Sequence, residues 1–117
     1  TLALIFQPNH ITEGSSFPEP GEDGHISNNY IRHIFDTTSD YARGNRFTTW
    51  ILGSLNLHVI HHMFPQVCHV HYPALTRIVL ATAKEYGLSY REHRTVTGAF
   101  LAHLLWLKVL GSESAAP

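Results

Sequence analysis

The sequence holds 117 residues, of which 44% are hydrophobic and 15% charged, with ten histidines and a formal net charge of -1 at pH 7. A chain of this length is expected to form one small domain. Only eight Lys and Arg residues occur, without a basic stripe, which argues against a nucleic-acid-binding protein. The single cysteine, Cys68, excludes an internal disulfide and fits a reducing compartment.

The chain opens on an apolar segment, residues 1–6, that is followed by His10. The segment is too short and too poor in basic residues for a secretory signal, and is typical of the end of a longer apolar helix. No stretch reaches the roughly 18 consecutive apolar residues that a membrane span needs. Two interpretations stay open at this point, namely a soluble domain and a piece of a membrane protein.

The middle of the chain alternates polar loops with helical patterns. Residues 13–29 are rich in Ser, Pro, Gly and acidic side chains, which predicts an exposed loop. Residues 28–41 predict a short helix that ends in a turn. Residues 47–62 are largely apolar and predict one helix, which Pro65 terminates.

The last third of the chain predicts two further helices, so that the expected fold class is all-α. Residues 73–86 have an amphipathic spacing, with Pro73 in the first turn and Gly87 as C-cap. Residues 88–94 are expected to be extended, and residues 97–110 to form a second apolar helix. Residues 112–117 read as a frayed tail.

The most informative pattern is the histidine triplet His58, His61 and His62 in an apolar stretch. In a helix, residues three and four apart share one face, so the three imidazoles can converge on a metal. Consecutive helical side chains diverge by roughly 100°, so His61 and His62 could serve two metal ions. Neutral imidazole suits iron, zinc, copper and nickel alike. A merely polar patch is disfavoured, because imidazoles crowded in an apolar stretch need partners.

The other histidines have mostly structural interpretations. Cys68, His69 and His71 could in principle bind zinc, but their spacing matches no closed zinc site, and a role in shaping the next turn is favoured. By itself, His10 reads as a histidine at an interface. The remaining assignments are an exposed position for His25 and His93 and a packed one for His103.

Several pieces of the chain resemble membrane fatty acid desaturases, specifically the C-terminal part of the linoleoyl-CoA desaturase-like branch. The pieces include Phe6-Gln7 with His10, His-His-Met-Phe-Pro at 61–65, and Cys-His-Val-His-Tyr-Pro at 68–73. The resemblance implies an integral membrane enzyme whose histidine boxes, on the cytosolic side, hold two irons. It also implies oxygen-dependent removal of two hydrogens from a fatty acyl chain.

Carried over position by position, the resemblance assigns roles to particular residues. The triplet His58, His61 and His62 matches the family's third histidine box and is expected to be catalytic. His10 matches an isolated histidine that precedes that box, which makes these four the expected iron ligands. The polar residues expected to orient the ligands from outside are Asn56, Glu13 and His33.

The resemblance also divides the chain and implies partners. The expected segments are 1–10 (end of a membrane helix), 11–46 (loop and short helix), 47–65 (helix with the third histidine box), 66–111 (cytosolic helices) and 112–117 (tail). The acyl substrate would be carried by CoA, a lipid or a carrier protein. No haem, flavin or iron-sulfur motif occurs, so electrons are expected from a ferredoxin or a cytochrome b5-like donor.

Two departures from the family's pattern affect what the resemblance implies. The family's first two histidine boxes are missing, so these 117 residues alone are expected to be an inactive fragment or truncated product. Many relatives carry glutamine at the position of His58 and a polar residue at that of Ile60, so the double-bond position does not transfer. Two alternatives stay open, namely a related membrane di-iron hydroxylase and a non-catalytic histidine-rich metal-binding module.

Overall fold

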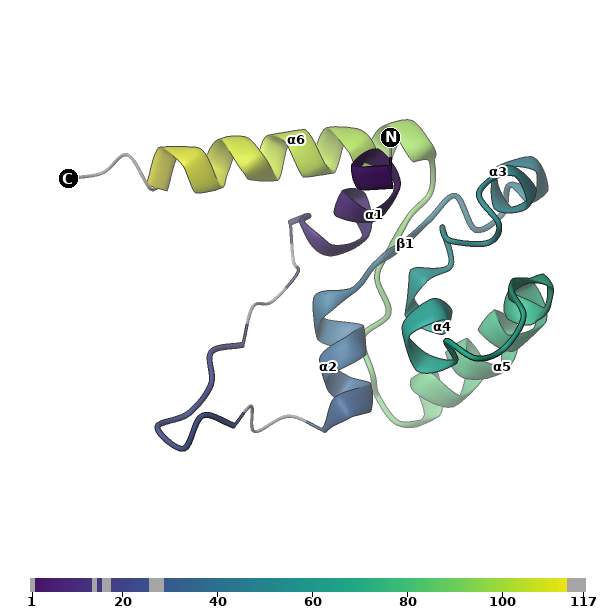
Figure 1. Ribbon diagram of the computed structural model, residues 1–117, viewed down its shortest axis with the longest axis horizontal. Coiled ribbons are helices and arrows are strands. Elements are labelled where there is room, and N and C mark those ends of the chain that lie inside the picture. The colour runs from purple at the N-terminus through teal and green to yellow at the C-terminus, as the bar shows by residue number, and fades with distance from the viewer. Residues whose placement is uncertain (1, 14, 16–17, 26–28, 114–117) are drawn as a thin grey trace.

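The computed structural model describes residues 2–13, 15, 18–25 and 29–113. These residues are mostly helical, as the sequence predicts, and their only paired strands are two residues each. Figure 1 shows α6 lying along one side of the molecule over α1, with α2, α4 and α5 grouped on the other side. The elements are α1 (Leu2–His10), α2 (Tyr30–Thr37), β1 (Asp40–Tyr41), α3 (Arg46–Ile51), α4 (His58–Met63), the 3-10 helix η1 (His69–His71), α5 (Tyr72–Glu85), β2 (Glu92–His93) and α6 (Val96–Glu113).

The single helix predicted over residues 47–62 is wrong, because the structure has two short helices there, α3 and α4. Gly53 and Ser54 separate them, with φ angles of 56° and 61°. Left-handed backbone at two consecutive residues cannot continue a right-handed helix. Because of this break, the helix that carries the histidine triplet begins at His58 and does not continue the axis of α3.

The turn predicted after the first short helix is instead an extended segment. α2 ends at Thr37, and β1 pairs in parallel with β2 in the register Asp40 opposite Glu92 and Tyr41 opposite His93. The backbone N–H of Asp40 donates to the Arg91 carbonyl at 3.1 Å. Residues 88–94 were expected to be extended, and β2 confirms this for Glu92 and His93.

The main core lies between α2, α4 and α5. Its fully buried members include Phe35 from α2 and Val59 and Ile60 from α4, each 1% exposed. α5 begins with proline in its first turn, and Gly87, with a φ of 66°, follows its end, as the sequence predicts. The core side of α4 therefore fixes one face of the helix that carries the histidine triplet.

The peripheral parts agree with the sequence only in part, since Ser15, within the loop predicted to be exposed, is buried. Residues 19–25 of the predicted loop are exposed, while residues 14, 16–17 and 26–28 lie outside the described ranges. α6 continues through Gly111 to Glu113, so the predicted tail is helical at its start. Leu101, Leu104 and Leu105 of α6 are each more than half exposed. Among the helices described, none combines the length and the apolar character required to cross a membrane.

Candidate metal centre

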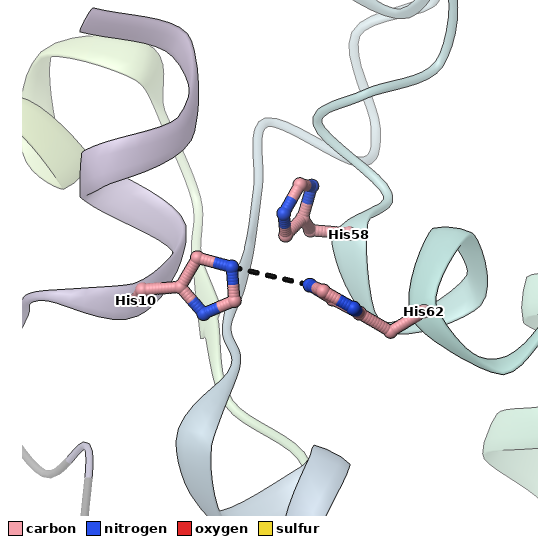
Figure 2. A group of neighbouring side chains, drawn as sticks. All are labelled: His10, His58 and His62. Atoms are coloured by element: carbon pink, nitrogen blue, oxygen red, sulfur yellow. Dashed lines mark hydrogen bonds between the residues drawn. The ribbon is translucent and has the colours of Figure 1, made fainter. Parts of the chain in front are cut away.

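Three histidines from two distant segments converge on one point. His10 ends α1, whereas His58 and His62 lie one turn apart on α4. One ligand nitrogen from each of the three lies within 4.8 Å of the other two. Figure 2 shows the His10 ring facing the two rings of α4, with Nε2 of His10 and Nε2 of His62 only 3.2 Å apart. Within the described ranges, no second group of His, Cys, Asp or Glu is this compact.

Two of the rings are held through Nδ1 by backbone carbonyls. Nδ1 of His10 donates to the Thr37 carbonyl at 3.3 Å, and Nδ1 of His58 donates to the Leu55 carbonyl at 3.1 Å. A neutral imidazole with its proton on Nδ1 keeps its lone pair on Nε2. These contacts therefore select the tautomer in which Nε2 of each ring is available to bind a metal.

Burial and the crowding of imidazoles lower the pKa values of two of the three rings, His58 and His62. Burial, with the neighbouring His10 and His62, lowers the pKa of His58 to about 3. Burial, with His10 and His61, lowers the pKa of His62 to about 4. Since neutral imidazole is the form that binds metal, both rings are ready to act as ligands at neutral pH.

The spacing of the His10 and His62 nitrogens fits a shared metal ion. Two imidazole nitrogens, each about 2.1 Å from a metal and about 90–110° apart as seen from it, lie roughly 3.0–3.4 Å from each other. The distance of 3.2 Å between Nε2 of His10 and Nε2 of His62 falls in this range. An all-imidazole donor set also suits iron. The residues present therefore fit the metal that the histidine box implies.

His61, the fourth expected ligand, lies beside this cluster and outside the compact group of three. Its ring centroid is 5.3 Å from that of His58 and 5.7 Å from that of His62. Nδ1 of His61 lies 3.4 Å from the hydroxyl of Tyr72, which itself donates to the Phe64 carbonyl. The neighbouring side chains of α4 thus diverge as a helix requires, and His61 points toward α5.

Among the described residues, none of the three residues expected to orient the ligands makes a hydrogen bond to a ligand ring. Asn56 is fully buried, but its amide donates to the Tyr41 carbonyl at 2.9 Å and to the Thr49 hydroxyl at 3.1 Å. Glu13 is exposed. His33 is half-buried on α2, and its Nδ1 is buried without a hydrogen-bond partner in the described part of the chain. The His10 and His58 rings are bound instead by backbone carbonyls, which residue types do not reveal, and the His61 ring lies beside the Tyr72 hydroxyl.

Sequence reasoning also missed a buried carboxylate next to the cluster. Asp40 is 0% exposed and accepts hydrogen bonds from the Val59 N–H at 2.9 Å and the Tyr90 hydroxyl at 2.7 Å. Burial raises its pKa to about 6 despite these bonds. Burial and the adjacent Asp40 raise the pKa of Tyr90. The polar run that contains Asp40 is typical of a turn, so its pattern did not predict this contact.

Comparison with known proteins assigns the chain to a family. The family model for fatty acid desaturases matches residues 1–94. An acyl-lipid (8-3)-desaturase of Mortierella alpina is 42% identical over 110 residues, which cover 94% of this chain and 25% of that protein. An sn-1 linoleoyl-lipid 6-desaturase of Synechocystis is 36% identical over 114 residues, covering 97% of this chain and 32% of that protein.

A third relative, an acyl-lipid (8-3)-desaturase of Physcomitrium patens, is 38% identical over 110 residues, covering 94% of this chain and 23% of that protein. The chain thus spans about a quarter to a third of the length of these relatives. No solved structure matches it. The family match and these identities show that the chain belongs to the fatty acid desaturase family.

Proposed function

We propose that this chain supplies part of the iron centre of an oxygen-dependent acyl desaturase. The observation that carries the proposal is the convergence of His10, His58 and His62, whose ligand nitrogens lie within 4.8 Å of one another. His10 is separated from His62 by 52 positions in the sequence, so the cluster is a product of the fold. Membership of the desaturase family supplies the reaction class.

The three convergent histidines would hold one iron, and His61 would belong to a second. His61 turns away from the compact group, with Nδ1 beside the Tyr72 hydroxyl, which leaves Nε2 to bind an ion. Adjacent residues of one helix can serve two ions in this way, because their side chains diverge. The other ligands of a di-iron site would come from the first two histidine boxes, which the family pattern places in an earlier part of the protein.

Bound iron would supply the activation of molecular oxygen that no side chain can provide. In the overall reaction, two electrons from a donor and two from the acyl C–H bonds reduce oxygen to two waters, and a carbon-carbon double bond forms. The histidines contribute neutral nitrogens at fixed positions. The Phe6 ring, 5.5 Å from the His58 ring, helps to exclude water from the reacting site.

We infer a fatty acyl chain esterified to a lipid as the substrate class. The relatives from Mortierella alpina, Synechocystis and Physcomitrium patens are all named for acyl-lipid or linoleoyl-lipid substrates. This favours a lipid over CoA or a carrier protein. The proposed setting is a membrane, with the histidines on the cytosolic side and a ferredoxin or cytochrome b5-like protein as electron donor.

Product analysis of the full-length protein tests the proposal. The wild type and the His62→Ala and His25→Ala variants are expressed in a host that lacks the activity, and total lipid acyl chains are analysed by gas chromatography with mass spectrometry. New double bonds are expected from the wild type and His25→Ala, because His25 lies in the exposed loop, and none from His62→Ala. New hydroxyl groups would indicate the hydroxylase alternative, and desaturation by His62→Ala would contradict the proposed ligand.

A further inference from the structure

We propose that Asp40, held by Tyr90, is a positioning residue that sets the orientation of α4 and thereby brings His58 and His62 onto His10. The inference rests on the proposed metal centre, and it concerns residues that do not touch the metal themselves. It follows from three features of the structure. α4 is too short to be stable as an isolated helix, the buried Asp40 carboxylate contacts its first turn, and the residues that flank Asp40 contact the surroundings of the ligands on both α1 and α4.

α4 has little to fix it from within. It is six residues long, and its N-cap residue, Leu57, makes no side-chain capping bond. Helices this short are unstable alone, because nucleation costs more than a single turn of hydrogen bonds returns. The missing cap is supplied by Asp40, whose Oδ1 accepts the Val59 N–H at 2.9 Å. A residue 19 positions away thus closes the first turn of the histidine helix.

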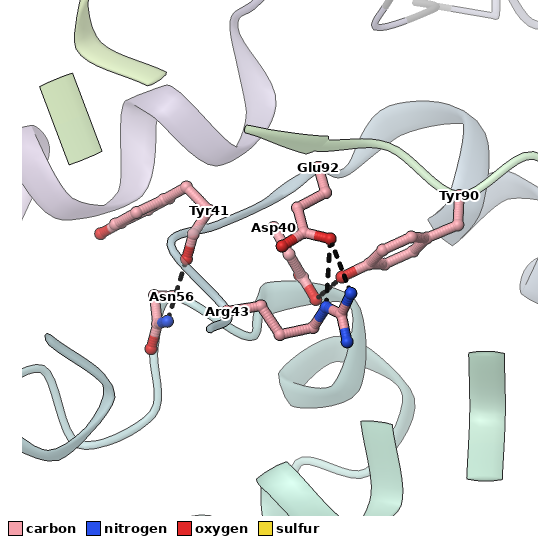
Figure 3. Close-up of polar contacts among 6 residues, drawn as sticks. All are labelled: Asp40, Tyr41, Arg43, Asn56, Tyr90 and Glu92. Atoms are coloured by element: carbon pink, nitrogen blue, oxygen red, sulfur yellow. Dashed lines mark hydrogen bonds and ion pairs between the residues drawn. The ribbon is translucent and has the colours of Figure 1, made fainter. Parts of the chain in front are cut away.

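Asp40 is itself held on its other side. Oδ2 accepts a hydrogen bond from the Tyr90 hydroxyl at 2.7 Å, so both carboxylate oxygens have partners. Figure 3 shows this pair together with the ion pair between Arg43 and Glu92, whose nearest atoms are 3.0 Å apart. Because Asp40 has no exposed surface, water cannot replace either bond. The carboxylate therefore has one orientation, set by Tyr90, and transmits it to Val59.

The residues on either side of Asp40 reach the other half of the site. The Thr37 carbonyl accepts from the His10 ring, and the Ser39 N–H donates to the Asn9 carbonyl at 2.7 Å. Tyr41 N–H donates to the Asn56 carbonyl at 3.1 Å, two residues before His58. The continuous segment from the last residue of α2 to the end of β1, residues 37–41, therefore contacts a ligand or the immediate surroundings of a ligand on both α1 and α4.

Small rotations of α4 would matter at the metal. A side-chain tip lies about 5–6 Å from the axis of its helix, so a rotation of about 10° moves it by about 1 Å. Ligand constellations tolerate deviations of about 0.5 Å. Loss of the Asp40 carboxylate removes the acceptor that holds the first turn of α4 from outside, at the residue next to His58. Metal affinity should respond more strongly than the packing of α4 against the core.

Metal affinity of the full-length protein tests the inference, with Co²⁺ as an optical probe and Fe²⁺ as the second metal. Asp40→Ala removes both contacts and is expected to weaken binding by about 10-fold or more and to change the Co²⁺ absorption spectrum. Tyr90→Phe removes one contact and is expected to weaken binding by about threefold. Asp40→Asn keeps the shape and an oxygen acceptor for Val59, so it should restore affinity to within about threefold of the wild type.

Two controls separate positioning from general destabilisation. Val79→Ala lowers stability by trimming the core on α5, and Glu92→Gln breaks the neighbouring ion pair; neither should change the affinity or the spectrum. Unchanged metal affinity in Asp40→Ala and Tyr90→Phe would overturn the inference, and Tyr90→Phe alone decides if Asp40→Ala does not fold. A wild type that binds neither metal would overturn the proposed function itself.

Discussion

Replacing Asp40 by asparagine should stabilise the metal-free protein at neutral pH. Its folded pKa of about 6 lies above the unfolded value of 3.8, so folding disfavours the charged form. Below pH 3.8 the Asp40 carboxyl is protonated in both states, and its full contribution to stability is present. This contribution is lost as the pH rises from 3.8 toward 6 and above. The difference between the pKa values of 3.8 and about 6 corresponds to a loss of about 3 kcal/mol of stability above pH 7. Asparagine resembles the protonated acid and does not titrate.

The assay is denaturant unfolding of metal-free wild type and Asp40→Asn between pH 4 and pH 7. The difference in free energy of unfolding should be small at pH 4, should grow in favour of the variant through pH 5 and 6, and should level off near 3 kcal/mol. Comparing the two proteins at each pH cancels the titration of groups that they share. A difference that does not change with pH, or one that favours the wild type at pH 7, would refute the burial argument.

The remaining predictions concern the turn, the core and the histidines. Ser54→Gly should raise the free energy of unfolding by about 1 kcal/mol, because Ser54 has a φ of 61°, and denaturant melts that show no gain would argue against strain there. Ile60→Ala should cost about 2–5 kcal/mol and Ile78→Ala less than about 0.5, since the two side chains are 1% and 64% exposed. The pKa of His58 is about 3 when folded against 6.5 unfolded, so acidification below pH 6.5 destabilises the metal-free protein. At pH 5 the contribution of His58 to this loss in free energy of unfolding is about 2 kcal/mol. A His58→Gln variant that loses as much stability on acidification as the wild type would contradict this prediction.

Local sequence signals predicted the regular parts of the fold well. Apolar spacing and the flanking Pro73 and Gly87 identified α5, because both residues act through their own backbone geometry. The same reasoning joined α3 and α4 into one helix. Glycine takes up left-handed backbone at no steric cost, but the left-handed φ of Ser54 has no such residue-type signal.

In the candidate site, too, some features were predictable from the sequence and others were not. The triplet spacing placed His58 and His62 on one face of a helix, and the resemblance to desaturases added His10, which the fold brings to them. The supporting contacts were not predictable, because the rings bind backbone carbonyls of Thr37 and Leu55, and a carbonyl carries no residue-type signature. Asp40 escaped notice for a similar reason, since its partner on α4 is a backbone N–H.

The most direct test of a shared metal centre is the metal affinity of His10→Ala, because His10 is the proposed ligand that α1 contributes. Iron content and Fe²⁺ affinity are measured in the full-length wild type, His10→Ala and His25→Ala. Loss of iron and an affinity at least about 10-fold weaker in His10→Ala, with His25→Ala unchanged, is the predicted result. Equal iron content and affinity in all three proteins would contradict the account, since His10 would then be no ligand.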